Sequence, residues 1–288
     1  ILSGTLIASN LGGFSTKWGD TPNIIEAQTW GLQHGDFFRQ ILPINIGLLI
    51  LVIVIVSAIA QRIIKKQKEK SPNRARIVYS MVEFRTRRRN TEINKRLFVV
   101  GLTGLIIAIF GSLFFPKYEL LFAAGAIIFC VLSDFKEHRT ETLFALGLET
   151  YATLLSIFVI AQVVAHSKIG IGDQLQSFLQ NADGRVSVIV LTSYFGTLFT
   201  EAASWASAAS PIVHLLKSSP QAAWALGAGI CAGSSSLVTA ATAGIILTNE
   251  TKDNEEGYKI TFSKYIPYGL GISAFMVLYY IITLNLFF

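Results

Sequence analysis

Hydrophobic residues make up 52% of the 288 positions and charged residues only 15%, which excludes an ordinary soluble domain, because such domains are less apolar and more charged. The net charge of +6 is concentrated in one stretch: residues 61–96 hold 13 lysines and arginines against three glutamates, a net +10, which leaves −4 for the remainder. A basic block between apolar spans is typical of a cytoplasmic loop, with nucleic-acid binding as a minor alternative. We therefore predict an all-α, multi-pass integral membrane protein of the cell (inner) membrane.

The first notable stretch is SNLGGFSTKWGDTPN, residues 9–23, a polar segment between an apolar start and the first long apolar span. A helix that unwinds at membrane depth leaves backbone N–H and C=O groups without partners, which is tolerated where the backbone lines a water-filled or ion-filled cavity. The segment therefore suggests a binding site. An ordinary extramembrane loop with Gly-Asp and Thr-Pro turns is the alternative.

A crossing of the bilayer needs about 20 apolar residues. The spans predicted on this basis are Ile41–Ala60, Leu97–Phe115, Leu120–Ser133, Thr142–Ala165 and Ile266–Phe288. The turn PKYE at Pro116–Glu119 is too short to hold a domain, so the spans on either side of it form an antiparallel pair. Residues 166–185 form a polar external loop, in which Gln174–Leu179 is a candidate for a short surface helix.

The segment Val186–Leu216 is 31 residues long, too long for one simple crossing, and is broken by FTEAASWASAASP. A re-entrant hairpin explains the length, the small residues and Pro211, and a bent crossing of two short helices is the alternative. The next span, Gln221–Leu247, is interrupted by CAGSSS at Cys231–Ser236. With a hairpin, the charged loop 248–264 and its three lysines fall inside, as the positive-inside rule prefers.

The opening and closing blocks share a layout: a Gly/Ser/Thr break, a polar loop, a Phe-x4-Pro element and an uninterrupted apolar span. The elements are FRQILP at Phe38–Pro43 and FSKYIP at Phe262–Pro267. By the predicted topology the two blocks cross in opposite directions. This is an inverted repeat, in which substrate and coupling ion bind near the midplane between broken helices. Identity between the blocks is low, so chance similarity is the alternative.

The segment ASNLGGFSTKWGDTPNII resembles the signature of the ion transporter superfamily that includes arsenite permeases, citrate and dicarboxylate transporters, sodium/proton antiporters of the same fold and the melanosomal P protein. CAGSSSLVTAATAGII is similar to that family's second Gly-rich break, and YATLLSIFVIAQ resembles its helix before the second hairpin. The resemblance implies a secondary active transporter (permease), a symporter or antiporter coupled to Na⁺ or H⁺, that works by alternating access.

The chain departs from the family in two respects. Glu201 and Pro211 keep the family's spacing of carboxylate and proline, but Ala202 and Ser204 replace an Asn and a first Pro, so a carboxylate is kept and an amide is lost. Family members also carry an amino-terminal scaffold and a first hairpin before the motif. Because the chain starts on Ile1 within a membrane-type sequence, we expect it to be the carboxyl-terminal part of a larger transporter whose amino-terminal part is missing or encoded elsewhere, and to be incomplete alone.

The candidate binding residues offer neutral oxygens, N–H donors or carboxylates, which coordinate ions at helix ends. They are Ser9, Asn10, Gly12, Gly13, Ser15, Thr16, Asp20, Asn23, Glu201, Ser204, Ser234, Ser235, Ser236 and Thr239. A Na⁺ ion is expected at Asn10, Thr16, Glu201 and Ser234. Small residues also serve close helix packing, which is the alternative for the serines. Glu201 stands out because an ionisable group inside a membrane span costs several kcal/mol unless paired or wet; a water-facing glutamate at the hairpin mouth is its alternative.

The predicted organisation is residues 1–60, a broken helix plus a span; 61–96, the basic loop; 97–165, scaffold helices; 166–185, the external loop; and 186–288, the hairpin, the second broken helix and the last span. We expect a transporter rather than an enzyme, and one that is not coupled to ATP, because no ATP-binding P-loop is present. A non-transporting truncated or degenerate relative acting as scaffold or sensor is the main alternative, and a channel is a weaker one.

No cofactor is expected apart from Na⁺ or H⁺ as coupling ion. The expected partners are a small ion or anion, the lipid bilayer, the missing amino-terminal segment and a second copy in a homodimer. Cys130 and Cys231 are expected to be buried thiols, since they show no metal-site spacing.

Overall fold

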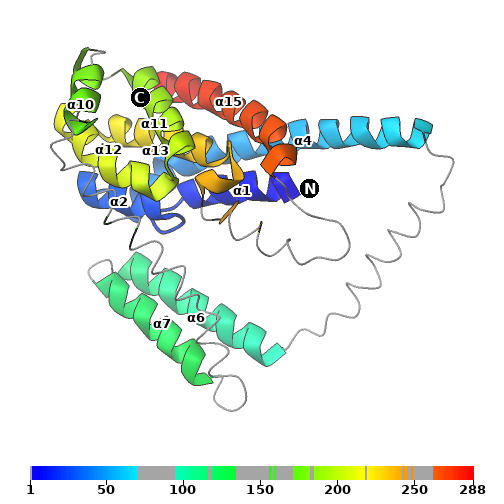
Figure 1. Ribbon diagram of the computed structural model, residues 1–288. Helices are drawn as coiled ribbons and strands as arrows, with labels where there is room; N and C mark the ends of the chain where they lie inside the picture. Colours follow the sequence, from blue (N-terminus) through cyan, green and yellow to red (C-terminus); the bar gives the residue numbers. More distant parts are fainter. Residues whose placement is uncertain are drawn as a thin grey trace. The chain divides into compact units, whose positions relative to one another are not determined.

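The computed structural model describes residues 2–70, 95–115, 118–133, 171–181, 185–217, 219–241, 243–244 and 262–288, together with Ser156, Val159 and Thr248. Within these ranges all regular structure is helical, which confirms the predicted all-α class (Figure 1). The chain forms two units, residues 1–60 with 154–288, and residues 61–153. Most of the basic loop and the predicted span Thr142–Ala165, apart from Ser156 and Val159, lie outside the described residues.

The second unit contains a helical pair, α6 (Lys95–Phe114) and α7 (Glu119–Ser133). Tyr118 closes the turn between them by donating its backbone N–H to the carbonyl of Phe115 at 2.9 Å. Gly104 of α6 faces Cys130 of α7, and nearer the turn Gly111 faces Phe122, so the two helices run antiparallel as predicted. The small glycines allow this close approach.

The first unit begins with a broken helix. Helix α1 (Leu2–Phe14) ends within the Gly-rich stretch 9–23, directly after its Gly-Gly pair, and six residues separate it from α2 (Thr21–Trp30). A short helix α3 (His34–Asp36) and a π-helical turn η1 (Phe37–Ile41) then lead into α4 (Leu42–Lys70). The predicted break is therefore present. The helix α4 continues ten residues past the predicted end at Ala60, since Gln, Arg and Lys favour helix beyond the apolar span.

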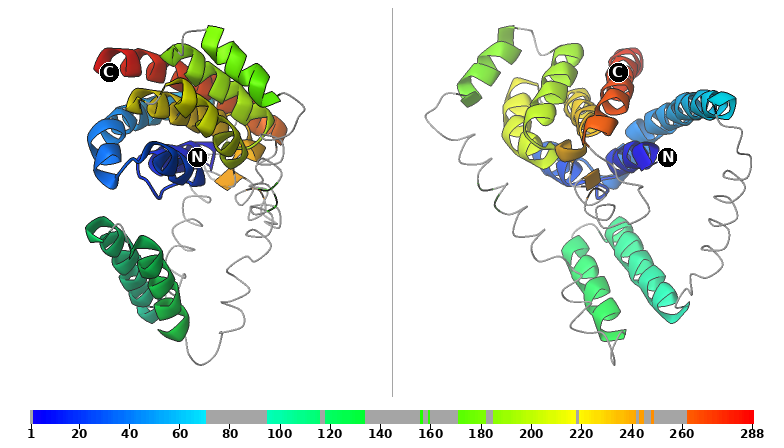
Figure 2. Two further views of the ribbon diagram at one scale, coloured as in Figure 1. Left: turned by 90° about the vertical axis from the view of Figure 1, so that its left-hand side faces the viewer. Right: turned by 45° about the vertical axis from the view of Figure 1, so that its right-hand side comes forward.

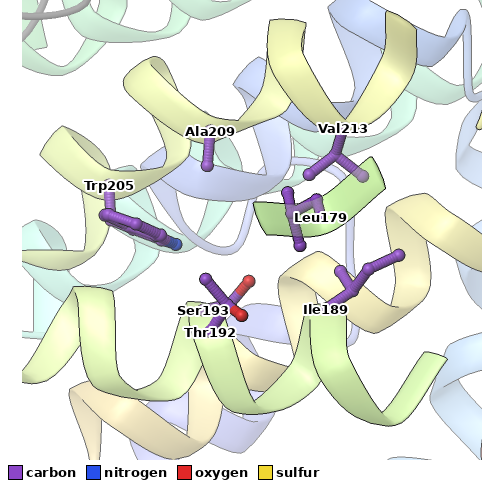
Figure 3. A pocket seen from close by; sticks show the side chains of 7 residues that line it. All are labelled: Leu179, Ile189, Thr192, Ser193, Trp205, Ala209 and Val213. Carbon is purple, nitrogen blue, oxygen red and sulfur yellow. The ribbon is translucent and has the colours of Figure 1, made fainter. Parts of the chain in front are cut away.

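The predicted hairpin is formed by α11 (Val186–Phe199) and α12 (Ala202–Leu216), which turn at Thr200–Glu201. The helices have 14 and 15 residues. Each is therefore about 21–23 Å long, short of the ~30 Å hydrocarbon core. The helix α10 (Ile171–Asn181) includes the predicted surface helix. Figure 3 shows its Leu179 between the hairpin arms, near Ile189 on α11 and Val213 on α12. The space that these side chains line has no room for a water molecule.

Helix α13 (Pro220–Ser234) lies at the centre of the first unit and contacts α1, α2, α11, α12 and α15 (Phe262–Phe287) (Figure 2). Its alanines, glycines and Trp224 are buried. A Cβ on Gly229 would lie 2.6 Å from that of Ser193, and one on Gly233 would lie 2.7 Å from that of Thr197. Glycines four residues apart therefore let α11 pack directly on the backbone of α13.

Among the described residues, two helices are long and apolar enough to cross a bilayer, His34–Arg62 and Tyr265–Phe287. Only 28% and 39% of their apolar windows are buried. Side chains such as Ile53, Val54 and Leu278 are more than half exposed, which suits contact with lipid and does not suit the core of a soluble domain.

Candidate ion-binding site

Two helix N-termini meet at one small cavity. Asp20 caps α2, with Oδ1 accepting the backbone N–H of Thr21 at 2.9 Å. Glu201 caps α12, with Oε2 accepting the backbone N–H groups of Ala203 at 2.9 Å and Ser204 at 3.1 Å and the Ser204 hydroxyl at 3.3 Å. The two carboxyl groups are close enough for their charges to interact. Each helix therefore presents a fixed carboxylate to the same space.

The cavity has a volume of about 70 Å³. Its lining residues are Ser9, Asn10, Gly19, Asp20, Glu201, Ala202, Ala241 and Ala243. Since one water needs about 10–15 Å³ of such space, the cavity has room for a few waters or a partly hydrated ion. Pockets for larger organic ligands measure ~300 Å³ or more. The size therefore suits a small ion.

Side chains within the first break satisfy the backbone that unwinds there. Asn23, 1% exposed, donates its Nδ2 to the carbonyls of Gly13 at 2.8 Å and Thr16 at 2.7 Å. Ser15 donates to the carbonyl of Leu11 at 2.7 Å. The carbonyls of Gly13 and Thr16 also accept the backbone N–H groups of Thr16 and Gly19, so these side-chain bonds reinforce the turns of the break. Ser15, Thr16 and Asn23 therefore shape the break and do not line the cavity.

Asn10 joins the two breaks. Its Nδ2 donates to Oγ of Ser235 at 3.1 Å, and its carbonyl accepts from the thiol of Cys231 at 3.5 Å. Tyr265 of α15 donates to the carbonyl of Ser235 at 2.6 Å, which holds the second break from the other side. The predicted contact between the broken helices is therefore made through an amide and a hydroxyl.

The hydroxyls of the second break donate to carbonyls of the preceding helical turn, and two of them also bond to other helices, Ser235 to Asn10 of α1 and Ser236 to Ser273 of α15. Ser234 and Ser235 donate to the carbonyl of Cys231, each at 2.9 Å, and Ser236 lies 3.2 Å from the carbonyl of Ala232 and 2.8 Å from Oγ of Ser273. Beyond this turn, η3 (Val238–Ala240) carries Thr239, which is exposed.

The structure divides the predicted site residues into two groups. Those that line the cavity are Ser9, Asn10, Asp20 and Glu201, with Ser204 and Ser235 hydrogen-bonded to them. Those that are not among its lining residues are Gly12, Gly13, Ser15, Thr16, Asn23, Ser234, Ser236 and Thr239. The expected sodium ligands are divided in the same way, with Asn10 and Glu201 at the cavity and Thr16 and Ser234 away from it.

Two buried polar residues near the breaks, Asn45 and Glu26, were not among the candidate binding residues. Asn45 of α4 donates to Oγ of Ser15 at 3.0 Å and accepts from Tyr280 of α15 at 2.8 Å. Asn45 could have been recognised in the sequence as a single Asn inside an apolar span, where a polar side chain usually hydrogen-bonds to another helix. Glu26 of α2 is fully buried. Its signal was a carboxyl group directly after the apolar pair Ile24–Ile25.

The citrate transporter family (CitMHS) matches residues 1–229. The chain belongs to this family. The "46 kDa membrane protein" of Mycobacterium leprae (strain TN) is 26% identical over 288 residues, covering 96% of this chain and 65% of the relative. The "Magnetosome protein MamN" of Magnetospirillum gryphiswaldense is 27% identical, covering 96% and 66%, and that of Paramagnetospirillum magneticum is 29% identical, covering 96% and 66%. The chain thus spans about two thirds of the length of these relatives.

Membership of the citrate transporter family confirms the resemblance seen in the first break. The family consists of transporters, and one relative is named as a membrane protein, which together with the two long apolar helices indicates a membrane location. The match includes six of the eight residues that line the cavity, from Ser9 to Ala202, and leaves out Ala241 and Ala243. Both capping carboxylates therefore lie in the part of the chain that the family model covers.

Proposed function

We propose that this chain forms the ion-coupling part of a multi-pass secondary active transporter, and that a Na⁺ ion or a proton binds between Asp20 and Glu201. The observation that carries the proposal is the pair of capping carboxylates on one cavity of about 70 Å³. Asn10 and Ser9 add neutral oxygens at the same cavity. The substrate is a small ion or anion, with citrate the first to test because of the family.

The charges at the cavity favour a cation over an anion. Two carboxylates supply two negative charges, and each helix N-terminus offsets about half a charge. About one negative charge remains among the lining groups, which matches one monovalent cation or one proton. An anionic substrate would be repelled here, so we place it elsewhere and assign this cavity to the coupling ion.

Alternating access follows if the two broken helices form an inverted repeat. Each break is followed by a long helix with a proline near its start, Pro43 at the second position of α4 and Pro267 at the sixth position of α15. Both long helices are apolar enough to span a bilayer. In such repeats the ion site lies at the broken ends, and motion of one element against the scaffold exposes it to either side. We propose the hairpin α11–α12 as the moving element, since Glu201 lies at its tip.

The substitution Glu201→Gln, made in the full-length protein, tests the assignment. The amide oxygen of Gln accepts the same backbone N–H groups, so α12 keeps its cap and the protein should still fold and insert, but the negative charge is lost. We expect citrate uptake driven by an imposed Na⁺ or H⁺ gradient in proteoliposomes to be abolished. Ser204→Ala is the matched control, because it removes the longest hydrogen bond to Glu201 and no charge.

Uptake by Glu201→Gln at the wild-type rate, with the same dependence on pH and Na⁺, would show the coupling role to be wrong and make Asp20→Asn the next test. Absence of citrate flux in the wild-type protein under either gradient would count against citrate transport. With no flux of other small anions either, a non-transporting scaffold or sensor would be favoured.

A further inference from the structure

Glu26 is a buried carboxyl group that the proposed ion site does not use. Its side chain is 0% exposed in the second turn of α2. Neither carboxyl oxygen has a hydrogen-bond partner among the residues that the structure describes. An ionised carboxylate without partners in such a place costs several kcal/mol, and groups in this position neutralise instead.

The packing around Glu26 leaves no room for a metal ion. A Cβ on Gly227 of α13 would lie 2.6 Å from Oε2 of Glu26 and would also collide with the ring of Phe14. A bound cation needs several oxygen ligands around it. Both Glu26 oxygens lack a polar partner in the described part of the chain. A proton is the ligand that requires neither space nor further ligands.

Glu26 is nevertheless connected electrostatically to the cavity. Its charge interacts with that of Asp20, and Asp20 interacts in turn with Glu201. Several other titratable or charged groups lie on the same segment as Glu26 or on the elements packed around it. They are Lys17, Asp20, Glu201, His214, Cys231 and Tyr280. Glu26, at the buried contact of α2 with α13, is therefore coupled by charge to Asp20 at the cavity, and Asp20 is coupled to Glu201.

We propose that Glu26 is a second, proton-binding site: it holds a proton in the conformation described and exchanges it through Asp20 and the cavity when α2 separates from α13. In that step the O–H bond of Glu26 breaks, the proton passes to the Asp20 carboxylate or to a cavity water, and Glu26 is left as the carboxylate. Reversal restores the neutral acid as the helices close. The role in transport rests on the proposed function, but the protonation itself does not.

Infrared spectroscopy of the purified full-length protein tests the protonation directly. At neutral pH, where an exposed glutamate is ionised, the wild-type protein should show a carboxylic-acid C=O band that shifts on deuteration. Glu26→Gln should lose this band. Asp36→Asn is the matched control and should keep the band. The Asp36 carboxyl group is partly exposed and accepts a hydrogen bond from the backbone N–H of Gln33. An unchanged band in Glu26→Gln would overturn the proposal.

Thermal unfolding gives a second readout that does not depend on transport. Gln is permanently neutral and has the size of protonated Glu, so Glu26→Gln should fold. A group that is protonated only in the folded state loses its stabilising effect as pH rises, because unfolding then releases a proton. The Tm of Glu26→Gln should therefore exceed that of the wild type increasingly towards alkaline pH. Parallel pH profiles would contradict a proton held at Glu26.

Proton exchange is tested by citrate uptake under an imposed pH gradient. We expect Glu26→Gln to lose its response to the gradient, and Glu26→Asp, which keeps a titratable group, to retain it with a displaced pH profile. A wild-type response in Glu26→Gln, even with the band lost, would overturn the exchange step. If the wild-type protein transports nothing, the proposed function fails, while the infrared band still decides whether Glu26 carries a proton.

Discussion

At the scale of single residues, the first break depends on Asn23 as well as on its glycines. Its one amide group donates to the carbonyls of Gly13 and Thr16, each of which also accepts a backbone N–H within the break. Gly19 contributes by its lack of a side chain, since a Cβ there would lie 2.6 Å from Oγ1 of Thr16. The break is thus a defined structure held by side-chain hydrogen bonds.

Asn23→Ala should therefore destabilise the protein. It removes two buried hydrogen bonds, each worth roughly 0.5–1.5 kcal/mol, while the carbonyls of Gly13 and Thr16 keep their backbone donors. The measurement is unfolding of the full-length protein in detergent, followed by circular dichroism. Gln28→Ala, at an exposed position of the same helix, is the control and should change stability by no more than about 0.5 kcal/mol. Equal losses in both variants would mean that Asn23 does not hold the break.

How far residues could be predicted depended on whether their chemistry showed in the sequence. Asn10, Asp20 and Glu201 stood out as polar groups in apolar surroundings, and all three reach the cavity. Thr16 and Ser234 have the same chemistry, but sequence does not give the direction in which a side chain points from an unwound backbone. Glu26 was overlooked because Gln28 and Thr29 follow it, so α2 reads as a partly polar segment.

At the scale of elements, the contact of α11 with α13 brings the hairpin against the centre of the unit. It depends on Gly229 and Gly233, which present backbone where other residues would present side chains. Lipid tails are as apolar as helix side chains, so the hydrophobic effect does not bring helices together in a bilayer, and close packing is a main source of helix association. The hairpin tip at Glu201 is therefore positioned through glycines of another helix.

Gly233→Ala tests this contact. The added Cβ would meet Thr197 Cβ at 2.7 Å and the Tyr194 carbonyl oxygen at 2.8 Å, so α11 must shift. Overpacking of this kind costs about 1–3 kcal/mol. Gly271→Ala on α15, where nothing lies within 4 Å of the added Cβ, is the matched control and should leave the Tm unchanged or higher. The proposal fails if the two variants melt alike.

The elements themselves were largely predictable because breaks and turns have a local chemistry. Small residues and Thr-Glu mark the hairpin turn, and Gly-Asp before Thr-Pro marks the start of α2, where Asp20 is the cap. The end of α4 was not predictable from hydropathy, because a helix does not have to stop where it becomes polar. The central place of α13 was also hidden, since its alanines and glycines read as weakly apolar and not as a core.

At the scale of the whole molecule, the basic block fixes the orientation that we predict. Residue 71 follows directly on α4, whose apolar window ends at Arg62. By the positive-inside rule we expect this end to lie in the cytoplasm. Thiol labelling of Ser71→Cys in intact cells, on a background without Cys130 and Cys231, should fail from outside and succeed after permeabilisation. Ser177→Cys, exposed on α10 in the predicted external loop, is the matched control and should be labelled from outside. Efficient external labelling at residue 71 would reverse the topology.

The capping carboxylates at the cavity have a further consequence, which is one of thermodynamic reciprocity. The Asp20 and Glu201 side chains that would hold an ion are also the ones that satisfy the first amides of α2 and α12. Ion binding and the order of these two helix ends are then linked, and the linkage free energy has the same value in both directions. If unwinding the first turn of α2 or α12 lowers the ion affinity by some factor, then ion binding must lower the equilibrium constant for that unwinding by the same factor. The folding of these two helix ends would then contribute to the binding constant of the ion.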